Sequence, residues 1–426
     1  MTKFSDNYDV IVCGGGPSGI SAAVSSARQG AKTALIERYG ILGGMLTSGY
    51  VNPILGAISE GTVYEEMLSL LNAVKNKTRI GYEIGIDSEK AKYILLKYVS
   101  DAGVDIFLQT PVVDVIKEKN TVNGVIIGTQ NGLKELRAKA VVDATGDGFV
   151  ASIAGAECAI GRDDGRCQPA TTEFTIENVD ESTAILCTGG SDPVKLPDGT
   201  GYSDFCKLKN REGELPENVN IVRLHRTFNP GERSVNATQV NGVNTLTPEG
   251  VCEAELELRS QIDVIISFLR KYVPGYENCR LKATGSTLGV RESRRVIGDY
   301  ILNDNDVETG TRKEDVAVHK AWFLIDIHNP NGGGQAEGRS QPSIPYDIPY
   351  RCFLPKGIDG LLTCGRCISG THRAHASYRV MGICIATGQA AGTAAALSSN
   401  NGVTPRELDV KQLQKALTDA GVQLFD

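Results

Sequence analysis

Several features that would reveal a function at once are scarce or missing in this sequence. Its 426 residues contain one tryptophan and five histidines, and the first histidine is His225. No apolar run reaches the roughly 18–20 residues that cross a bilayer, and the N-terminus lacks the charged-then-apolar order of a secretion signal. A basic excess is also missing, since the net charge is −7. We therefore expect a cytoplasmic protein with no nucleic-acid partner and no membrane partner.

The eleven cysteines form no disulfide framework, and in an unexported protein we expect them to be reduced. Cys364 and Cys367 form a C-x-x-C pair with three open interpretations. They are small core residues, a redox dithiol, or half of a zinc site that His372 and His375 would complete. The strand-and-turn pattern around them favours the first interpretation, and we predict no metal site.

Glycine is abundant, with 48 residues, and its clearest pattern lies near the N-terminus. An apolar run, Tyr8–Cys13, is followed by G-x-G-x-x-G, a helix and a second strand that ends at an acidic residue. Glycines at these positions allow a tight turn and close approach of a pyrophosphate to the helix N-terminus, and the acid suits ribose hydroxyls. The unit predicts a dinucleotide site formed by Gly14, Gly16, Pro17, Ser18, Gly19, Glu37 and Arg38.

Two further segments extend this pattern. Short strands run from Val104 to Val142, with turns expected at Asn123–Gly124 and Asn131–Gly132, and end in Ala-Thr-Gly. Much later, a strand at Leu361–Cys364 and a Gly-Arg turn precede a helix at Met381–Leu397 that is rich in glycine and alanine.

In this order, the segments resemble the FAD-dependent oxidoreductases of the glutathione-reductase-like superfamily and, more distantly, fumarate reductase and succinate dehydrogenase flavoproteins. The resemblance is specific over Tyr8–Pro53, Val141–Arg162 and Tyr346–Leu397. It implies an α/β fold, with a Rossmann-like FAD-binding domain and β-meander at 1–165 and 346–426. An inserted α+β substrate domain would occupy 166–345.

The resemblance also implies FAD as the cofactor. Since no histidine precedes His225, we expect FAD to be held noncovalently, and a cysteinyl link is the open alternative. Gly365-Arg366 departs from the Gly-Asp often found at that place. The further cofactor contacts that the resemblance implies are Gly43, Gly44, Met45, Val113, Thr145, Gly146, Asp147, Gly365, Arg366 and Gly382.

The segment Glu37–Pro53 keeps the frame of a loop in which flavin disulfide reductases present two cysteines. Leu46 and Val51 stand at the two sulfur positions. A second glycine fingerprint, which NADPH would need, is also missing from the sequence. These absences argue against a disulfide reductase and favour direct chemistry between flavin and substrate.

The segment between the late strand and helix supplies the catalytic candidates. His372 and His375 suit proton transfer, and Arg379 suits a carboxylate. If the segment is extended, the two histidines point to opposite sides, so that one faces the substrate. Arg291 belongs to a second cluster of arginines. Hydrogen bonding to flavin, for the histidines, and structural ion pairs, for Arg291–Arg295, are the alternatives.

We therefore expect an enzyme, an FAD-dependent oxidoreductase that transfers a hydride directly between FAD and a small polar metabolite, with carboxylate as one candidate group. The rival hypothesis is a non-redox or assembly role, like that of RNA-modifying or thiazole-forming relatives. The expected partners are a small-molecule substrate and an electron donor or acceptor that the sequence does not identify. A homo-oligomer is compatible with it.

Overall fold

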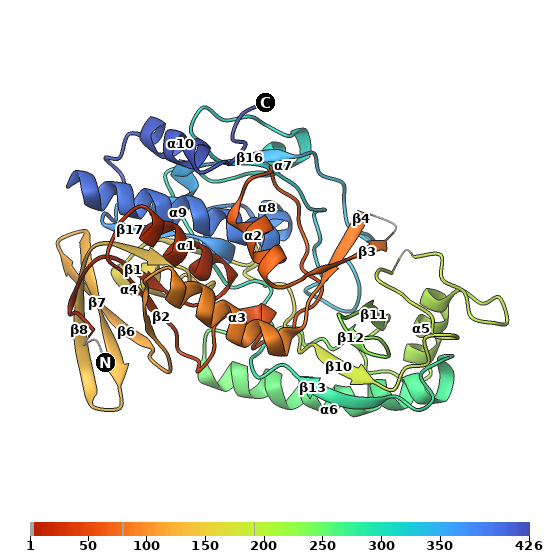
Figure 1. The fold of residues 1–426 in the computed structure, drawn as a ribbon. Helices are drawn as coiled ribbons and strands as arrows, with labels where there is room; N and C mark the ends of the chain where they lie inside the picture. Colours follow the sequence, from red (N-terminus) through yellow and green to blue (C-terminus); the bar gives the residue numbers. More distant parts are fainter. Residues whose placement is uncertain (1–3, 79–80, 191) are drawn as a thin grey trace.

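The N-terminal glycine unit forms the centre of the larger part of the protein (Figure 1). The computed structural model describes residues 4–78, 81–190 and 192–426. In it, β1 (Asn7–Cys13) leads through the glycine turn into α1 (Pro17–Arg28) and then β2 (Thr33–Ile36). Val10 and Val12 pack into one hydrophobic cluster, whereas Ile11 and Cys13 pack into another on the opposite face. Burial on both faces explains why β1 is continuously apolar.

The central sheet has seven strands in the order β5-β2-β1-β8-β7-β6, with β17 beside β8. Parallel pairing joins β1 to β2 and β8, β2 to β5, and β8 to β17. The antiparallel meander consists of β6, β7 and β8. The bounds are β5 (Asp105–Phe107), β6 (Val112–Glu118), β7 (Thr121–Thr129), β8 (Gly132–Asp143) and β17 (Leu361–Thr363).

The predicted turns in this region have different outcomes. The turn at Asn131–Gly132 is confirmed, because it joins β7 to β8. The turn at Asn123–Gly124 is wrong, since both residues lie inside β7 and the chain reverses at Lys119–Asn120. The left-handed backbone of Lys119, with φ of 53°, performs that reversal without glycine. The segment that begins at Val104 yields β5, which extends the parallel sheet instead of the meander.

Helices cover one face of the sheet, and the meander with α4 (Phe149–Ala154) covers the other. The first group includes α3 (Ser88–Asp101) and α9 (Met381–Asn401). The predicted helix rich in glycine and alanine is α9, and its glycines pack directly on α1. A Cβ atom at Gly388 would lie 2.0 Å from the carbonyl oxygen of Ser18, and one at Gly392 would lie 2.1 Å from that of Ala22. Only glycine permits this approach of the two backbones.

The smaller part of the protein, to the right in Figure 1, has its own sheet and hydrophobic cluster. The strand order is β11-β12-β10-β13. The bounds are β10 (Phe174–Glu177), β11 (Arg223–Arg226), β12 (Arg233–Asn236), β13 (Arg280–Thr284), α5 (Tyr202–Arg211) and α6 (Pro248–Tyr272). This cluster is drawn from residues 174–279, whereas apolar side chains of 302–327 join the main cluster. The exact domain boundaries stay a prediction.

The other elements are short or peripheral. The two-stranded sheets are β3 (Val74–Thr78) with β4 (Gly81–Gly85), β9 (Cys158–Ile160) with β14 (Arg294–Val296), and β15 (Val316–Ala321) with β16 (Tyr346–Pro349). The other helices are α2 (Val63–Leu70), α7 (Asp304–Thr309), α8 (His372–Tyr378), α10 (Val410–Asp419), and the 3-10 turns η1 (Gly44–Leu46), η2 (Tyr350–Phe353) and η3 (Gly365–Cys367).

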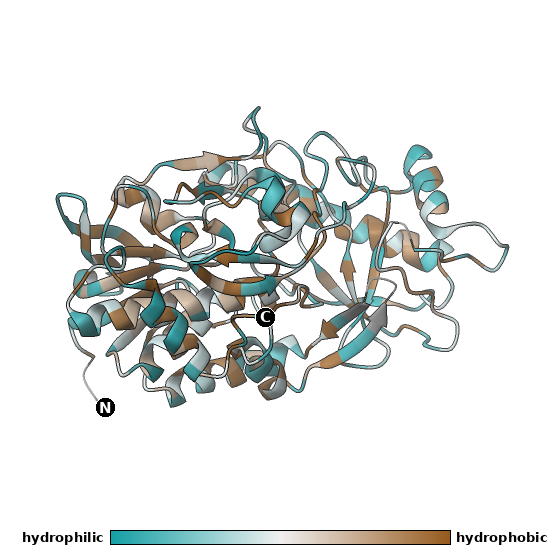
Figure 2. Cartoon of the chain, turned by 90° about the horizontal axis from the view of Figure 1, so that it is seen from above, coloured by the Kyte–Doolittle hydropathy of each residue, from teal (hydrophilic) through white to brown (hydrophobic). Residues whose placement is uncertain are grey.

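Hydrophobic residues gather along the central strands (Figure 2). Within the described residues, no single helix is both long and apolar enough to cross a membrane, and α8 with α9 meets both conditions only as a pair bent by 94°.

Candidate cofactor and substrate site

Glycine is needed at the three positions of the fingerprint for different physical reasons. Gly14 has φ of +105°, and a Cβ atom there would lie 2.6 Å from the carbonyl oxygen of Ala144. A Cβ atom at Gly19 would lie 1.8 Å from the carbonyl oxygen of Gly14. Gly16, in contrast, has φ of −72°, and a Cβ atom there would meet no heavy atom within 4 Å. Gly14 and Gly19 are needed for packing, whereas Gly16 keeps a space open at the start of α1.

That open space is suited to a phosphate group. Gly16 is the N-cap of α1 and provides no side-chain cap, while Pro17 begins the helix. The N–H groups of Ser18 and Gly19 therefore lie at the positive end of the helix dipole. The backbone of Gly44 approaches from the other side, since a Cβ atom there would lie 2.9 Å from the Cα atom of Gly16.

Glu37, at the end of β2, holds the glycine turn in place. Its Oε2 accepts the N–H of Gly15 at 2.6 Å, and its Oε1 accepts the N–H of Tyr39 at 2.8 Å. Burial raises the pKa of Glu37, and these two N–H donors act in the opposite direction. Arg38 is exposed and lies over the ring of Tyr39 at 4.8 Å. Val113 is exposed on β6, where its side chain lies against Gly128.

Thr145, Gly146 and Asp147 follow β8 and approach η3. Thr145 donates its hydroxyl to the buried Asp143 at 2.6 Å and accepts the N–H of Phe149. Asp147 Oδ1 accepts bonds from Arg366 Nη2 and Ser293 Oγ, each at 2.7 Å. Although burial alone would raise it, the pKa of Asp147 is lowered by Arg366 and Ser293.

Asp147, in the loop after β8, therefore provides a carboxylate partner for Arg366 of the unusual Gly365-Arg366 pair. A Cβ atom at Gly365 would lie 2.6 Å from Ser18 Oγ, which places η3 directly beside the start of α1. Arg366 Nη1 is buried and has no hydrogen-bond partner among the described residues. An unsatisfied buried guanidinium nitrogen is costly, so this atom is suited to an acceptor on a bound ligand.

The loop with the disulfide-reductase frame contains no cysteine. Gly43 and Gly44 have φ of 109° and 51°, and Met45 is half-buried. Leu46 is 1% exposed and belongs to the main hydrophobic cluster. Ser48 accepts the N–H of Ser286 on its carbonyl oxygen at 2.7 Å, which ties the loop to the smaller part of the protein.

Cys364 and Cys367, on either side of the Gly365-Arg366 pair, are buried free thiols. Cys367 Sγ donates to the carbonyl oxygens of Cys364 and Asp143, at 3.5 and 3.8 Å. Burial raises the pKa of both thiols, which opposes thiolate formation. Across the described ranges, no three histidine, cysteine, aspartate or glutamate side chains are grouped to hold a metal. The geometry favours small core residues.

The expectation of an extended His-Arg segment is wrong. Thr371 caps the N–H of Ala374 with its hydroxyl, and His372–Tyr378 form α8. Residues three apart lie on nearly the same face of a helix, so the two histidines do not point to opposite sides. A threonine cap followed by alanines was the available signal for a helix.

The two histidines differ in their partners. His372 Nδ1 lies 2.8 Å from Oε1 of the buried Glu292. His375 is fully buried, and neither ring nitrogen has a hydrogen-bond partner among the described residues. Burial, reinforced by the charges of Arg295 and Arg379, lowers the pKa of His375 well below its usual value. His375 is therefore a neutral ring whose two nitrogens are available to a polar ligand.

Arg379 and Arg291 reach the same cluster of charges. Arg379 Nη2 lies 3.2 Å from Asp326 Oδ2. Arg291 donates to the carbonyl oxygen of Pro169 at 2.9 Å and to Asn236 Oδ1 at 3.3 Å, and no carboxylate forms an ion pair with it in the described parts of the chain. Burial and the charges of Arg379 and Arg223 lower the pKa of Arg291 to about 9.

We use the name cation cluster for three arginines and the acidic and histidine groups beside them: Arg223, Arg291, Arg379, Glu173, Asp326 and His328. The sequence analysis predicted Arg291 and Arg379 as site residues and missed the other four. Burial and the charge of Arg291 lower the pKa of His328 to about 3, and the pKa of Asp326 is lowered well below its usual value despite burial, chiefly by His328 and Arg379. Alternation was the missed signal, because Asp326 and His328 share one face of an apolar segment.

A cavity of about 330 Å³ adjoins the cation cluster. Its lining includes Gln168, Arg291, Glu292 and Ser293, together with apolar residues such as Val240 and Leu246. Ser293 binds Asp147, and Glu292 binds His372, so this lining leads back to the predicted cofactor contacts. The space is of the size that small-molecule sites have in proteins.

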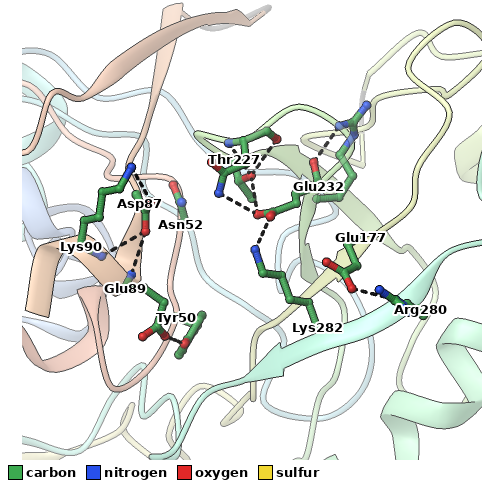
Figure 3. A network of polar contacts seen from close by, with 12 residues as sticks. Tyr50, Asn52, Asp87, Glu89, Lys90, Glu177, Thr227, Glu232, Arg280 and Lys282 are labelled. Atoms are coloured by element: carbon green, nitrogen blue, oxygen red, sulfur yellow. Dashed lines mark hydrogen bonds and ion pairs between the residues drawn. The ribbon is translucent and has the colours of Figure 1, made fainter.

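The border between the two parts of the protein is polar (Figure 3). Tyr50, Asn52 and the start of α3 lie on one side, and Thr227, Glu232 and Lys282 lie on the other. Lys90 lies over the ring of Phe228 at 5.4 Å and bridges this border. Glu232 forms an ion pair with Lys282.

Together, the open glycine cradle, the parallel sheet with its meander, and the unpartnered Arg366 and His375 atoms define a Rossmann-type flavoprotein. These features fit FAD. The space at Gly16 would take a phosphate group, and the atoms of Arg366 and His375 that lack partners would take polar atoms elsewhere on the cofactor. Residues 9–417 match the family described as FAD dependent oxidoreductase, and the chain belongs to this family. The predicted fold class, enzyme class and cofactor are thereby confirmed.

Similar proteins share part of the sequence or the fold. A digeranylgeranylglycerophospholipid reductase of Thermoplasma volcanium is 31% identical over 161 residues, covering 34% of this chain and 40% of the relative. A thiamine thiazole synthase of Methanothermobacter thermautotrophicus is 33% identical over 147 residues, covering 32% of this chain and 55% of the relative. The matched regions span less than two thirds of both relatives.

Among solved structures, p-nitrophenol 4-monooxygenase PnpA from Pseudomonas putida DLL-E4 has a TM-score of 0.50 at 13% identity, covering 98% of this chain and 85% of that chain. This similarity shows the fold.

Proposed function

We propose that this protein transfers a hydride directly between noncovalent FAD and a small polar metabolite that carries a carboxylate. FAD, when bound, supplies a two-electron acceptor or donor for the hydride. The residues that would hold it are those around the open space at Gly16, together with Glu37, Gly44 and Arg366. No dithiol lies in the loop next to that space, since Leu46 is a core residue.

The observation that carries the proposal is the excess of positive charge in the cation cluster. Asp326 forms an ion pair with Arg379, whereas Arg291 is bound by a carbonyl and an amide oxygen and by no carboxylate among the described residues. His328 stays neutral because its pKa is lowered to about 3 by burial and by Arg291. A buried unpaired guanidinium is unfavourable without a counter-ion, so the cluster is suited to an anionic substrate.

Arg291 is placed to orient that anion. Its guanidinium is buried between Pro169 and Asn236 and lines the 330 Å³ cavity. Arginine binds a carboxylate with two parallel donors, and this fixes the direction of the substrate as well as its charge. Arg379, already paired with Asp326, would contribute charge more than direct contact.

Rapid mixing of the FAD-loaded protein with lactate, malate and succinate, without oxygen, tests the proposal. We expect one of these acids to bleach the flavin and its methyl ester to fail. Arg291→Gln should raise the half-saturating concentration about 10- to 100-fold, because a charge-assisted hydrogen bond contributes roughly 1.5–3 kcal/mol. Arg280→Gln, on an exposed ion pair with Glu177, is the matched control. Equal reaction of acid and ester would refute the anionic substrate.

A non-redox role is the second candidate, favoured by the similarity to thiamine thiazole synthase. The same experiment separates the two. A protein that holds FAD but is bleached by none of the acids or esters in the panel supports the second candidate.

A further inference from the structure

Glu173 occupies an unusual place between the cofactor loop and the cation cluster. It directly precedes β10 and is 4% exposed. Its Oε2 lies 3.4 Å from the backbone nitrogen of Asn52 and 3.3 Å from Ser234 Oγ, both donors. Asn52 belongs to the loop that begins with Gly43 and Gly44, so Glu173 is fixed from the cofactor side and from β12.

Only one of the two carboxyl oxygens is engaged in this way. In the described structure, Oε2 accepts the two bonds, and Oε1 has no hydrogen-bond partner. The carbonyl oxygen of Glu173 accepts the N–H of Gly285 at 3.0 Å, which fixes the backbone. A carboxyl group with one fixed and one free oxygen is oriented and still able to exchange a proton.

We propose that Glu173 is the proton-transfer residue of this site, acting on the substrate through Oε1. The inference rests on the proposed function. In the oxidative direction the substrate loses the electron pair of a C–H bond as hydride, for which the cofactor is the acceptor. It also loses a proton from an adjacent O–H or C–H bond, and Glu173 takes this proton to become a carboxylic acid. The reverse direction returns both, so electrons and protons balance.

The groups around Glu173 explain why it would exchange protons near neutral pH. Burial raises its pKa to about 7, while His225 on β11 and Arg291 act in the opposite direction. His225 is held by Glu83 from β4, with Nδ1 to Oε2 at 3.0 Å. The other charged groups in the cluster are Arg223, Arg379 and Asp326.

The other candidates are less suited to proton transfer. Asp326 stays ionised and His328 stays neutral, because the pKa of each is lowered. His375 also stays neutral, since its pKa is lowered well below the usual value by burial and nearby arginines. His372 is bound to Glu292. A general acid or base works best when its pKa lies near the working pH.

Glu173→Gln tests the inference, since it keeps the shape of the side chain and removes the proton site. With the acid that bleaches wild type, we expect flavin reduction to slow about 100- to 10,000-fold, with FAD content and half-saturating concentration little changed. The wild-type rate should rise through about pH 7, because the base must be unprotonated. Glu173→Asp should restore part of the rate and of the pH profile. Asp347→Asn, another buried carboxylate beside a histidine, is the control.

Infrared difference spectra provide a readout that does not depend on turnover. As the pH rises, the C=O band of a protonated carboxyl group should disappear in wild type with a midpoint near pH 7. This band should be missing at every pH in Glu173→Gln. An unchanged rate and pH profile in Glu173→Gln, or no such band, would overturn the inference. If the wild-type protein reacts with no acid in the panel, both the proposed function and the inference fail. If the wild type reacts and Glu173→Gln reacts equally fast with the same pH profile, only the inference fails.

Discussion

Gly16→Ala separates cofactor binding from folding more sharply than any other substitution in the fingerprint. The backbone at Gly16 has φ of −72°, which alanine adopts readily, and the added Cβ atom meets nothing within 4 Å. Replacing such a glycine stabilises a protein by about 0.4–1 kcal/mol, because the unfolded chain loses freedom. The FAD-free variant should therefore unfold at the same or a slightly higher denaturant concentration than wild type.

FAD binding should change in the opposite direction. The methyl group fills space beside the first N–H groups of α1, and each charge-assisted bond lost contributes roughly 1.5–3 kcal/mol. We expect the Kd for FAD to rise about 10- to 150-fold. Gly19→Ala is the contrasting variant, because its Cβ atom would lie 1.8 Å from the carbonyl oxygen of Gly14 and the fold itself should lose stability. Fluorescence titration and urea unfolding measure both quantities. Unchanged FAD affinity in a stable Gly16→Ala protein would place the phosphate elsewhere.

Three further predictions concern Glu37, the cysteine pair and His375. Glu37→Gln should weaken FAD binding without abolishing it in the same titration, because the amide keeps one acceptor for Gly15 but loses the charge. Cys364→Ala with Cys367→Ala should leave the rate of flavin reduction unchanged in rapid mixing, since both thiols are buried and protonated. In wild type, the lowered pKa of His375 means that stability falls as pH drops below about 6.5, where only the unfolded imidazole binds a proton. Urea unfolding of His375→Gln from pH 6.5 to 5 should show a slope flatter by up to about 1.4 kcal/mol per pH unit.

The local signals predicted the larger part of the fold. The apolar run of β1, the glycine turn and the small face of α9 each have a packing reason that is visible in the sequence, and the structure has all three. The errors arose where a short signal had two meanings. Asn123-Gly124 is a frequent hairpin turn, but here the glycine lies inside β7, where a Cβ atom would be 2.2 Å from the carbonyl oxygen of Leu136.

The candidate site was less predictable because its members come from distant segments. Glu173 precedes β10 and Arg223 lies on β11 of the smaller sheet, whereas Asp326 lies between Ile325 and Ile327 of the main hydrophobic cluster. Polar residues that alternate with apolar ones on a strand, such as Arg223 and His225 beside Leu224 on β11, would ordinarily face water. The structure instead covers that face, and His225 is 5% exposed. Sequence periodicity indicates which residues share a face but not what covers it.

The loop between Gly43 and Pro53 connects the cofactor space with the candidate substrate site. A disulfide reductase uses the two sulfur positions of this frame to exchange electrons, whereas here Leu46 packs into the core. The same loop ends at Asn52, whose backbone N–H reaches Glu173. Without a dithiol, the loop contacts the cofactor space at Gly44 and, eight residues later, orients a carboxyl group beside the cation cluster. In the proposed mechanism this loop therefore holds Glu173 for proton exchange with the substrate and takes no part in electron transfer through sulfur.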